Sequence, residues 1–179
     1  MRNWWIRVVI IVSVCGLMAP AVHAQGAEKF TKDATLLKFL DQLAEATYQF
    51  NIGNGQPFLA LVSSTAELTL MGAGGGFEKG IAQIKPRIDF LTQRRTKAEG
   101  YQDNRAVIEY ISVFAAGDLA YTVQIERRKL AEGQNIATDN VIRATHVLRK
   151  ENGAWKLLHR HADPLVQITV PGLPTPSRN

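Results

Sequence analysis

Three of the four histidines in the chain lie within sixteen residues, in the segment HVLRKENGAWKLLHRH (146–161). They are His146, His159 and His161, and Asp163 follows two positions further on. Three imidazoles and a carboxylate within reach of one another could bind zinc or exchange a proton with a ligand. Whether they do either depends on how the chain brings these side chains together.

The dipeptide Asn-Gly at 152–153 is typical of a tight turn between two antiparallel strands. If it forms a two-residue turn, Leu148 lies opposite Leu157 and His146 lies opposite His159. His161 would then share their face of the sheet, together with Asp163.

A three-residue loop over 151–153, with Gly153 in a bulge, is also compatible with the sequence, and it would move His146 to the face opposite His159. The first register is favoured because it keeps apolar residues together on one face, namely Ile142, Ala144, Leu148, Trp155 and Leu157. We expect no metal site here. Structural hydrogen bonding is the favoured use of these histidines, and lining a ligand or proton-transfer pocket is the next.

A second group of chemically capable residues lies on the preceding strand segments. Gln124 and Glu126 share one face of AYTVQIER, and Arg143 shares a face with Thr145 on the next segment. A carboxylate inside an apolar fold can have a raised pKa and act as a base. The favoured alternative is a structural ion pair between Glu126 and an arginine, such as Arg143 or Arg160.

The glycine-rich segment at 72–76 invites comparison with phosphate-binding loops. It matches neither the dinucleotide-binding spacing nor the P-loop, because Lys79 follows Glu78 where the P-loop has glycine before lysine. We expect the glycines to let the chain turn sharply from a strand into a helix.

Helical periodicity dominates the first half of the chain. Leucines and aromatic residues recur at three- and four-residue steps over 33–50, and Asp33 suits the N-cap. A short second helix is expected over 57–64, with Pro57 in its first turn. A strand is expected over 66–72 and a third helix over 80–95, in which Pro86 should cause a bend or mark an early turn.

After Lys97 the pattern changes to the two-residue alternation of strands. Four strands are expected, over 104–115, 118–130, 141–150 and 154–163, with a polar loop over 130–140. Helices followed by antiparallel strands indicate an α+β domain in which the helices cover one face of a curved sheet.

The N-terminal segment has the features of a signal peptide. Arg2 and Arg7 precede an apolar stretch, and Val22-His23-Ala24 is a small-x-small cleavage signal. We expect cleavage after Ala24 and a periplasmic or secreted protein without stable membrane insertion. The apolar run is shorter than the roughly 20 residues that a spanning helix needs.

Removal of residues 1–24 would leave 155 of the 179 residues, a length typical of one domain. The only cysteine, Cys15, would be lost, so neither a disulfide nor a thiolate metal site is expected. The net charge would fall from +5 to +3, which is too small to indicate a nucleic-acid partner.

Three segments in this order carry a resemblance to a known family: LTLMGAGGGFEKGIAQIKPRIDF, GDLAYTVQIER and IRATHVLRKENGAWKLLHRHADP. They resemble the SnoaL-like and DUF4440-type branch of the NTF2-like superfamily, over a domain at 31–164, which leaves 165–179 as a proline-containing tail. The resemblance implies a cone: N-terminal helices packed in a strongly curved, mixed and mostly antiparallel sheet. It also implies a pocket at the open end and frequent dimerisation through the sheet.

The resemblance implies several functions, because the superfamily includes isomerases, cyclases, dehydratases, hydrolases and non-catalytic binding domains. We expect a small, largely apolar ligand, no cofactor and a homodimer. In the enzymatic version, His159 or His161 exchanges a proton and Asp163 or Glu126 assists. The residues expected to contact the ligand are Tyr48, Trp155, His146 and Arg143. The alternative is a non-catalytic binding or dimeric interaction module whose pocket is closed.

Overall fold

A computed structural model describes residues 26–96, 106–128 and 140–165. The predicted signal peptide and nearly all of the predicted polar loop and C-terminal tail lie outside these ranges. Along the chain the elements are η1 (Ala27–Lys29), α1 (Ala34–Asn51), α2 (Gln56–Leu61), β1 (Thr69–Met71), β2 (Glu78–Lys79), α3 (Ile81–Thr96), β3 (Ala106–Ala116), β4 (Leu119–Arg128), β5 (Asn140–Glu151) and β6 (Ala154–Pro164).

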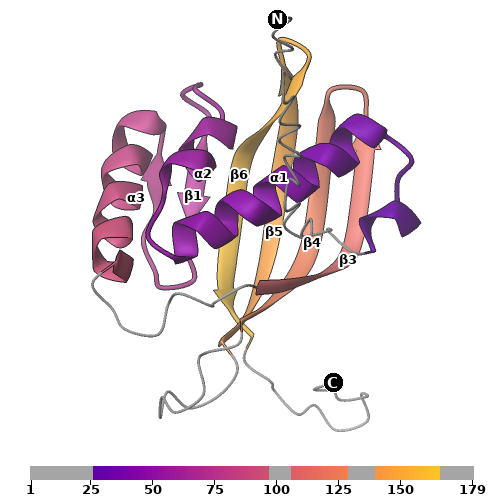
Figure 1. The fold of residues 1–179 in the computed structure, drawn as a ribbon. Helices are drawn as coiled ribbons and strands as arrows, with labels where there is room; N and C mark the ends of the chain where they lie inside the picture. The colour runs from indigo at the N-terminus through magenta and orange to yellow at the C-terminus, as the bar shows by residue number, and fades with distance from the viewer. Residues whose placement is uncertain (1–25, 97–105, 129–139, 166–179) are drawn as a thin grey trace, which may run out of the picture.

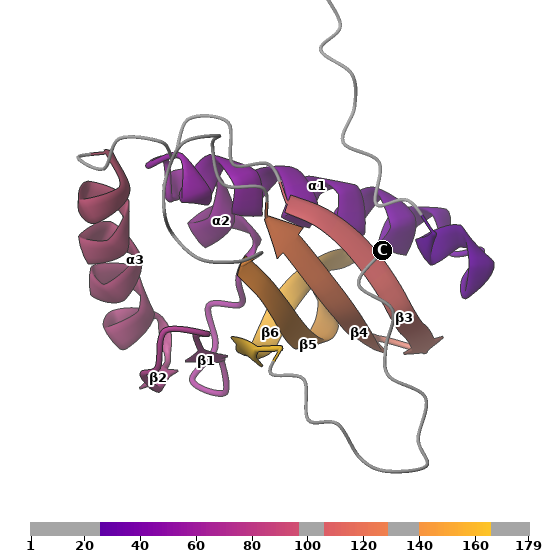
Figure 2. The same cartoon turned by 90° about the horizontal axis from the view of Figure 1, so that it is seen from below.

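The strands form one six-stranded sheet in the order β2-β1-β6-β5-β4-β3. All neighbours pair antiparallel except β1 and β6, which run parallel. Helix α1 lies diagonally across this sheet, and α3 lies beside it at the β1 and β2 end (Figure 1). Seen from below, the longer strands curve beneath α1 (Figure 2). The predicted α+β fold with helices against a curved, mixed and mostly antiparallel sheet is confirmed.

Helix α1 begins where the sequence predicts. The carboxylate of Asp33 accepts hydrogen bonds from the backbone N–H groups of Thr35 and Leu36, at 2.9 and 3.1 Å. These bonds satisfy two of the amides that a helix start leaves unpaired, so Asp33 is the N-cap. The helix then buries one apolar stripe against the inner face of the sheet, including Leu36, Leu40 and Leu43.

Helix α2 is shorter than predicted, while Pro86 does not end α3. Beyond Leu61 the chain becomes extended, and the backbone N–H of Ser63 donates to the carbonyl of Leu157 at 2.8 Å. This contact with β6 ends α2 before residue 64. Helix α3 continues through Pro86 to Thr96. Among the described residues, no helix is long and apolar enough to cross a membrane.

The glycine-rich segment leads from β1 into the two-residue strand β2, which pairs antiparallel with β1. The predicted direct passage from strand to helix is therefore wrong. Gly75 and Gly76 have φ of 85° and 96°, which only glycine adopts without strain. The chain consequently folds back on itself before α3 begins.

The β5–β6 hairpin follows the predicted register only near its turn. Asn152 and Gly153 have φ of 52° and 80°, as a two-residue turn of the predicted kind requires. Leu148 pairs with Leu157 as expected. The next pair is Val147 with His159, so Leu158 is an extra residue in a β-bulge.

The bulge reverses the faces of β6 beyond it, and His146 lies opposite Arg160. The predicted pairing of His146 with His159 is wrong for this reason. His146 and Arg160 point to the inner face, while His159, His161 and Asp163 lie on the outer face.

Candidate functional site

A cavity of about 320 Å³ lies between the C-terminal part of α1, α2, α3, the glycine-rich segment and the ends of β5 and β6. Its size is at the lower end of the range that small-molecule sites span. Apolar side chains supply much of its wall, among them Phe50, Phe58, Leu70, Ile88, Leu91 and Ile142. The polar groups of this wall decide which ligands the cavity could accept.

Asn51, the last residue of α1, is fully buried and lines the cavity. Among the described residues, neither its amide nitrogen Nδ2 nor its amide oxygen Oδ1 has a hydrogen-bond partner. Buried polar groups are paired in most proteins, because an unsatisfied donor or acceptor costs about 1–3 kcal/mol. Asn51 therefore offers the cavity one donor group and one acceptor.

Arg160 also lines the cavity, at the β6 end. Its Nη1 and Nη2 atoms donate to Oε1 and Oε2 of Glu126, at 2.6 and 2.9 Å. The two side chains are 11% and 1% exposed, so this is a buried bidentate ion pair. The favoured interpretation of Glu126 as an ion-pair partner is confirmed, with Arg160 as the arginine.

A line of buried hydrogen bonds along β4 holds this pair. Gln124 donates from Nε2 to Oε1 of Glu126 at 2.9 Å, and Thr122 donates to Oε1 of Gln124 at 3.0 Å. These three residues alternate along the inner face of β4, as strand geometry dictates. The carboxylate of Glu126 is thus positioned toward Arg160.

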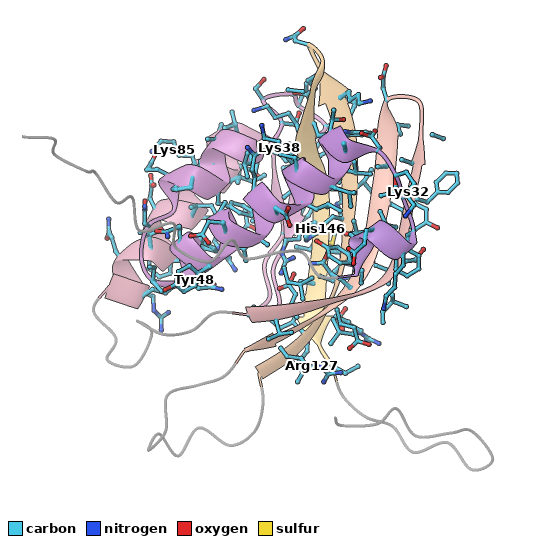
Figure 3. The ribbon with its side chains drawn as sticks, turned by 45° about the vertical axis from the view of Figure 1, so that its right-hand side comes forward. Lys32, Lys38, Tyr48, Lys85, Arg127 and His146 are labelled. Atoms are coloured by element: carbon cyan, nitrogen blue, oxygen red, sulfur yellow. The ribbon has the colours of Figure 1, made fainter. Side chains whose placement is uncertain are left out.

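His146 completes the cluster from β5 (Figure 3). Its Nε2 contacts Nη1 of Arg160, and since a guanidinium only donates, Nε2 accepts and the ring proton lies on Nδ1. Burial lowers the pKa of His146 to about 3, and the positive charge of Arg160 adds to this effect against the opposing charge of Glu126. His146 is therefore neutral at neutral pH and serves as an acceptor.

These contacts leave Arg160 with unused donors. Both hydrogens on Nη1 and one on Nη2 are engaged by Glu126 and His146. Within the part of the chain that the structure describes, the Nε hydrogen and the second Nη2 hydrogen have no acceptor. Arg160 can therefore donate to an oxygen atom of a ligand while it stays paired with Glu126.

The glycine-rich segment forms another wall of the cavity, around Arg87 of α3. Arg87 donates from Nη1 to Oε1 of Glu78 at 2.9 Å and from Nη2 to the carbonyl oxygen of Gly75 at 2.7 Å. Both Arg87 and Glu78 line the cavity. The second carboxylate oxygen of Glu78, Oε2, is buried without a partner among the described residues.

The predicted catalytic residues on β6 lie away from this cavity. His159 contacts the hydroxyl of Thr69 through Nδ1 at 2.7 Å, and its pKa is lowered by partial burial and by His161 nearby. The Nε2 atom of His161 is 3.8 Å from Oδ2 of Asp163, and Arg143 donates to the same carboxylate. The outer face carries His159, His161, Asp163 and Arg143. A catalytic or binding role for any of these four stays a prediction.

The other residues predicted to contact a ligand do not line the cavity either. Trp155 is buried, and its Nε1 donates to the hydroxyl of Thr35 at 3.1 Å. Tyr48 lies half-buried on α1, next to the cavity-lining Thr47 (Figure 3). His146 reaches the cavity only through Arg160. Their predicted roles in ligand binding remain untested.

The position of Asn51 in the sequence carries a signal for its role. Asn51 lies four positions after Thr47 and eight after Leu43, so it continues the buried stripe of α1. A polar amide at such a position needs a partner or a ligand. The cavity roles of Arg160, Glu78 and Arg87 had no comparable signal, because they depend on the bulge and on the packing of the glycine-rich segment.

The described residues contain no group of three or more histidine, cysteine or carboxylate side chains that could hold a metal ion. The four polar residues with unused hydrogen-bonding capacity at or behind the cavity are Asn51, Glu78, His146 and Arg160. Together they can bind neutral or anionic oxygen groups and hydrogen-bond donors.

Comparison with known proteins matches part of the chain to a family and shows which proteins share its fold. Residues 81–167 match the family model of the SnoaL-like domain. No curated protein matches the chain in sequence. The fold is similar to that of an NTF2-like protein of unknown function from Shewanella oneidensis, with a TM-score of 0.55 and 14% identity, covering 72% of this chain and 96% of that one.

Two further solved structures show the same fold. A provisionally assigned calcium/calmodulin-dependent protein kinase type II association domain from Thiobacillus denitrificans has a TM-score of 0.57 and 17% identity, covering 72% of this chain and 93% of that one. A provisionally assigned ketosteroid isomerase from Shewanella frigidimarina has a TM-score of 0.52 and 19% identity, covering 73% and 96%.

Residues 81–167 therefore match the SnoaL-like domain, and the described fold is that of NTF2-like proteins. At these identities the similarity to solved structures shows the fold and leaves the activity to be argued from the site.

Proposed function

We propose that this protein binds a small, largely apolar molecule in the cavity, with Asn51 as its polar anchor. The single observation that carries the proposal is the buried amide of Asn51, a cavity-lining residue whose two polar atoms have no hydrogen-bond partner among the described residues. Aromatic and aliphatic walls with a few convergent polar groups are typical of small-molecule sites. A ligand group that both donates and accepts would satisfy this amide.

The enzymatic form of the proposal is cofactor-independent acid–base chemistry of the isomerase, cyclase or hydrolase kind. The unused donors of Arg160 favour it, because they can stabilise negative charge that develops on a ligand oxygen. Glu126 acts in this proposal through Arg160, since both of its oxygens accept from that guanidinium. The name of the similar isomerase from Shewanella frigidimarina agrees with this class of chemistry.

A second candidate function is an interaction module that associates through its sheet. Large apolar side chains are exposed on the outer face of β3 and β4, where the ring centroids of Phe114 and Tyr121 stack 5.7 Å apart. Val107, Ile111 and Leu119 add to this patch and are at least half exposed. Apolar patches of this kind often mark protein–protein contacts, so the proposed assembly is a homodimer.

The proposed place of action is the periplasm or the cell exterior. This proposal rests on the positively charged, apolar and small-residue regions that follow one another within residues 1–24. Processing after Ala24 would appear as a purified protein that begins at Gln25.

Native mass spectrometry of the purified protein tests the binding proposal and the assembly in one spectrum. We expect an extra mass that is lost on denaturation, and the Leu91→Trp variant should lose it because the larger ring fills the cavity. Phe90→Trp is the matched control, since Phe90 is the neighbouring residue and is 55% exposed.

An extra mass in wild type and in Phe90→Trp, but not in Leu91→Trp, supports the cavity as the binding site. Equal retention of the mass by both variants would place it elsewhere. A dimer without any bound mass would instead favour the interaction module.

A further inference from the structure

We propose that Glu78 makes the cavity selective for ligands that carry a hydroxyl group, which donates a hydrogen bond to its Oε2 atom. This inference rests on the proposed function and names the chemical class of its ligand. Nothing in the family match assigns a role to Glu78, which lies before the matched residues 81–167.

The ion pair with Arg87 fixes the direction of the Glu78 carboxylate. Oε1 accepts from Nη1 of Arg87 at 2.9 Å, and the other end of that guanidinium is held by the carbonyl of Gly75. The Glu78 side chain is 14% exposed, and the paired Arg87 side chain is 26% exposed. Oε2 is left as a buried acceptor on a residue that lines the cavity.

The glycine-rich segment packs closely against Arg87. A Cβ atom on Gly76 would lie 2.5 Å from Nη1 of Arg87, so the backbone packs directly on the guanidinium. The absence of a side chain at Gly76 lets Arg87 reach Glu78 and Gly75 together. These contacts orient the carboxylate before a ligand arrives, which favours selective binding.

The Oε2 atom of Glu78 lacks a hydrogen-bond donor and does not lack a counter-charge. Arg87 already supplies the positive charge next to Glu78. The ion pair as a whole is therefore neutral and attracts a further cation only weakly. A neutral donor fits this position, and a hydroxyl is the simplest one on an apolar molecule. The same molecule can direct a carbonyl oxygen to Nδ2 of Asn51 or to the unused hydrogens of Arg160.

Three matched probes test this assignment: 4-hydroxyacetophenone, 4-methoxyacetophenone and 4-methylacetophenone. All three carry a carbonyl on an aromatic ring, and only the first can donate a hydrogen bond from its other end. Binding is measured by ligand-observed NMR titration in mildly acidic buffer, in which the phenol stays neutral. We expect the wild-type protein to prefer the hydroxyl probe over the methoxy probe by about tenfold.

The Glu78→Gln variant should remove or reverse this preference. Arg87 can only donate, so the amide oxygen of the new side chain must face it. The amide nitrogen then takes the place of Oε2 and presents a donor to the cavity, which favours the methoxy probe. Glu109→Gln is the control, because Glu109 lies on the outer face of β3 with its side chain 54% exposed.

The methyl probe reports whether the cavity is intact in each variant. If it binds Glu78→Gln as it binds wild type while the hydroxyl preference is lost, the assignment of Glu78 is supported. Equal affinities of the three probes for wild type, or an unchanged preference in Glu78→Gln, would overturn the assignment and leave the binding cavity standing. Failure of every probe to bind wild type would count against the proposed function itself. If Glu78→Gln fails to bind the methyl probe, the wild-type preference alone decides.

Discussion

Burial lowers the pKa of His146 more than the charges of neighbouring residues change it. The ring is 3% exposed and accepts from a guanidinium, and both conditions disfavour a second proton. Glu126 would favour protonation, but it is already neutralised by Arg160. A histidine in this setting orients its neighbour and does not exchange protons at neutral pH.

The lowered pKa of His146 predicts a loss of stability in acid. Its pKa is about 3 in the folded protein against 6.5 in the unfolded chain, so the unfolded state binds a proton first as pH falls. The stabilisation is therefore complete above about pH 6.5 and declines toward pH 3, by about 1.4 kcal/mol of unfolding free energy per pH unit. Urea denaturation at several pH values measures this slope.

The His146→Gln variant should flatten that slope between about pH 6.5 and pH 5, because glutamine keeps an acceptor for Arg160 and does not titrate. His159, whose pKa is also lowered, contributes a smaller part in the same direction. His161→Gln is the control, since that side chain is 54% exposed on the outer face. A slope that persists in His146→Gln would show that another group is responsible.

At the scale of elements, one inserted residue decides which side chains of β6 face the cavity. The sequence Leu157-Leu158 offers two adjacent apolar residues, and alternation alone does not say which of them points inward. The bulge at Leu158 allows Leu157 to pack in the core and still turns Arg160 inward. Regular strand alternation predicts the histidine cluster, because this insertion has no distinctive residue signature.

The glycine-rich segment yields a prediction of its own. Gly76→Ala introduces a Cβ at φ +96° and 2.5 Å from Nη1 of Arg87, so it both strains the backbone and displaces the ion pair with Glu78. Gly75 has a similar φ of +85°, but a Cβ there meets nothing within 4 Å. We expect Gly76→Ala to lower the unfolding free energy by about 1 kcal/mol more than Gly75→Ala. If chemical denaturation shows the same loss of unfolding free energy for both variants, backbone strain alone explains the effect.

At the scale of the whole molecule, the sequence was sufficient for the fold class and for most elements. Periodicities of 3.6 and 2 residues are strong over long segments, so α1, α3 and the four long strands were all expected. Strand β2 was missed because two residues carry no periodicity. Its presence nevertheless positions Glu78 and the glycine-rich segment at the cavity.

The cavity itself could not be predicted from the sequence. Its wall comes from three helices, the glycine-rich segment and four strands, and their relative placement depends on tertiary packing. Glu126 was recognised as an ion-pair residue because a mid-strand carboxylate needs a partner. Asn51 was overlooked because polar residues are ordinary at helix ends when they are exposed.

The amide of Asn51 provides the most direct test of the binding cavity. Asn51→Leu removes two unpartnered polar atoms from a buried position and leaves an apolar side chain there. We expect the unfolding free energy to rise by about 1–3 kcal/mol, while binding of 4-methylacetophenone and of any co-purified molecule is lost. Asn54→Leu, at an exposed position in the following loop, is the control for both readouts.

The decisive measurement is chemical denaturation of Asn51→Leu alongside its ligand titration. Higher stability together with lost binding is the predicted result. The unpaired amide destabilises the free protein, and a bound ligand supplies its hydrogen bonds. Lower stability with unchanged binding would contradict the account and would make Asn51 a structural residue.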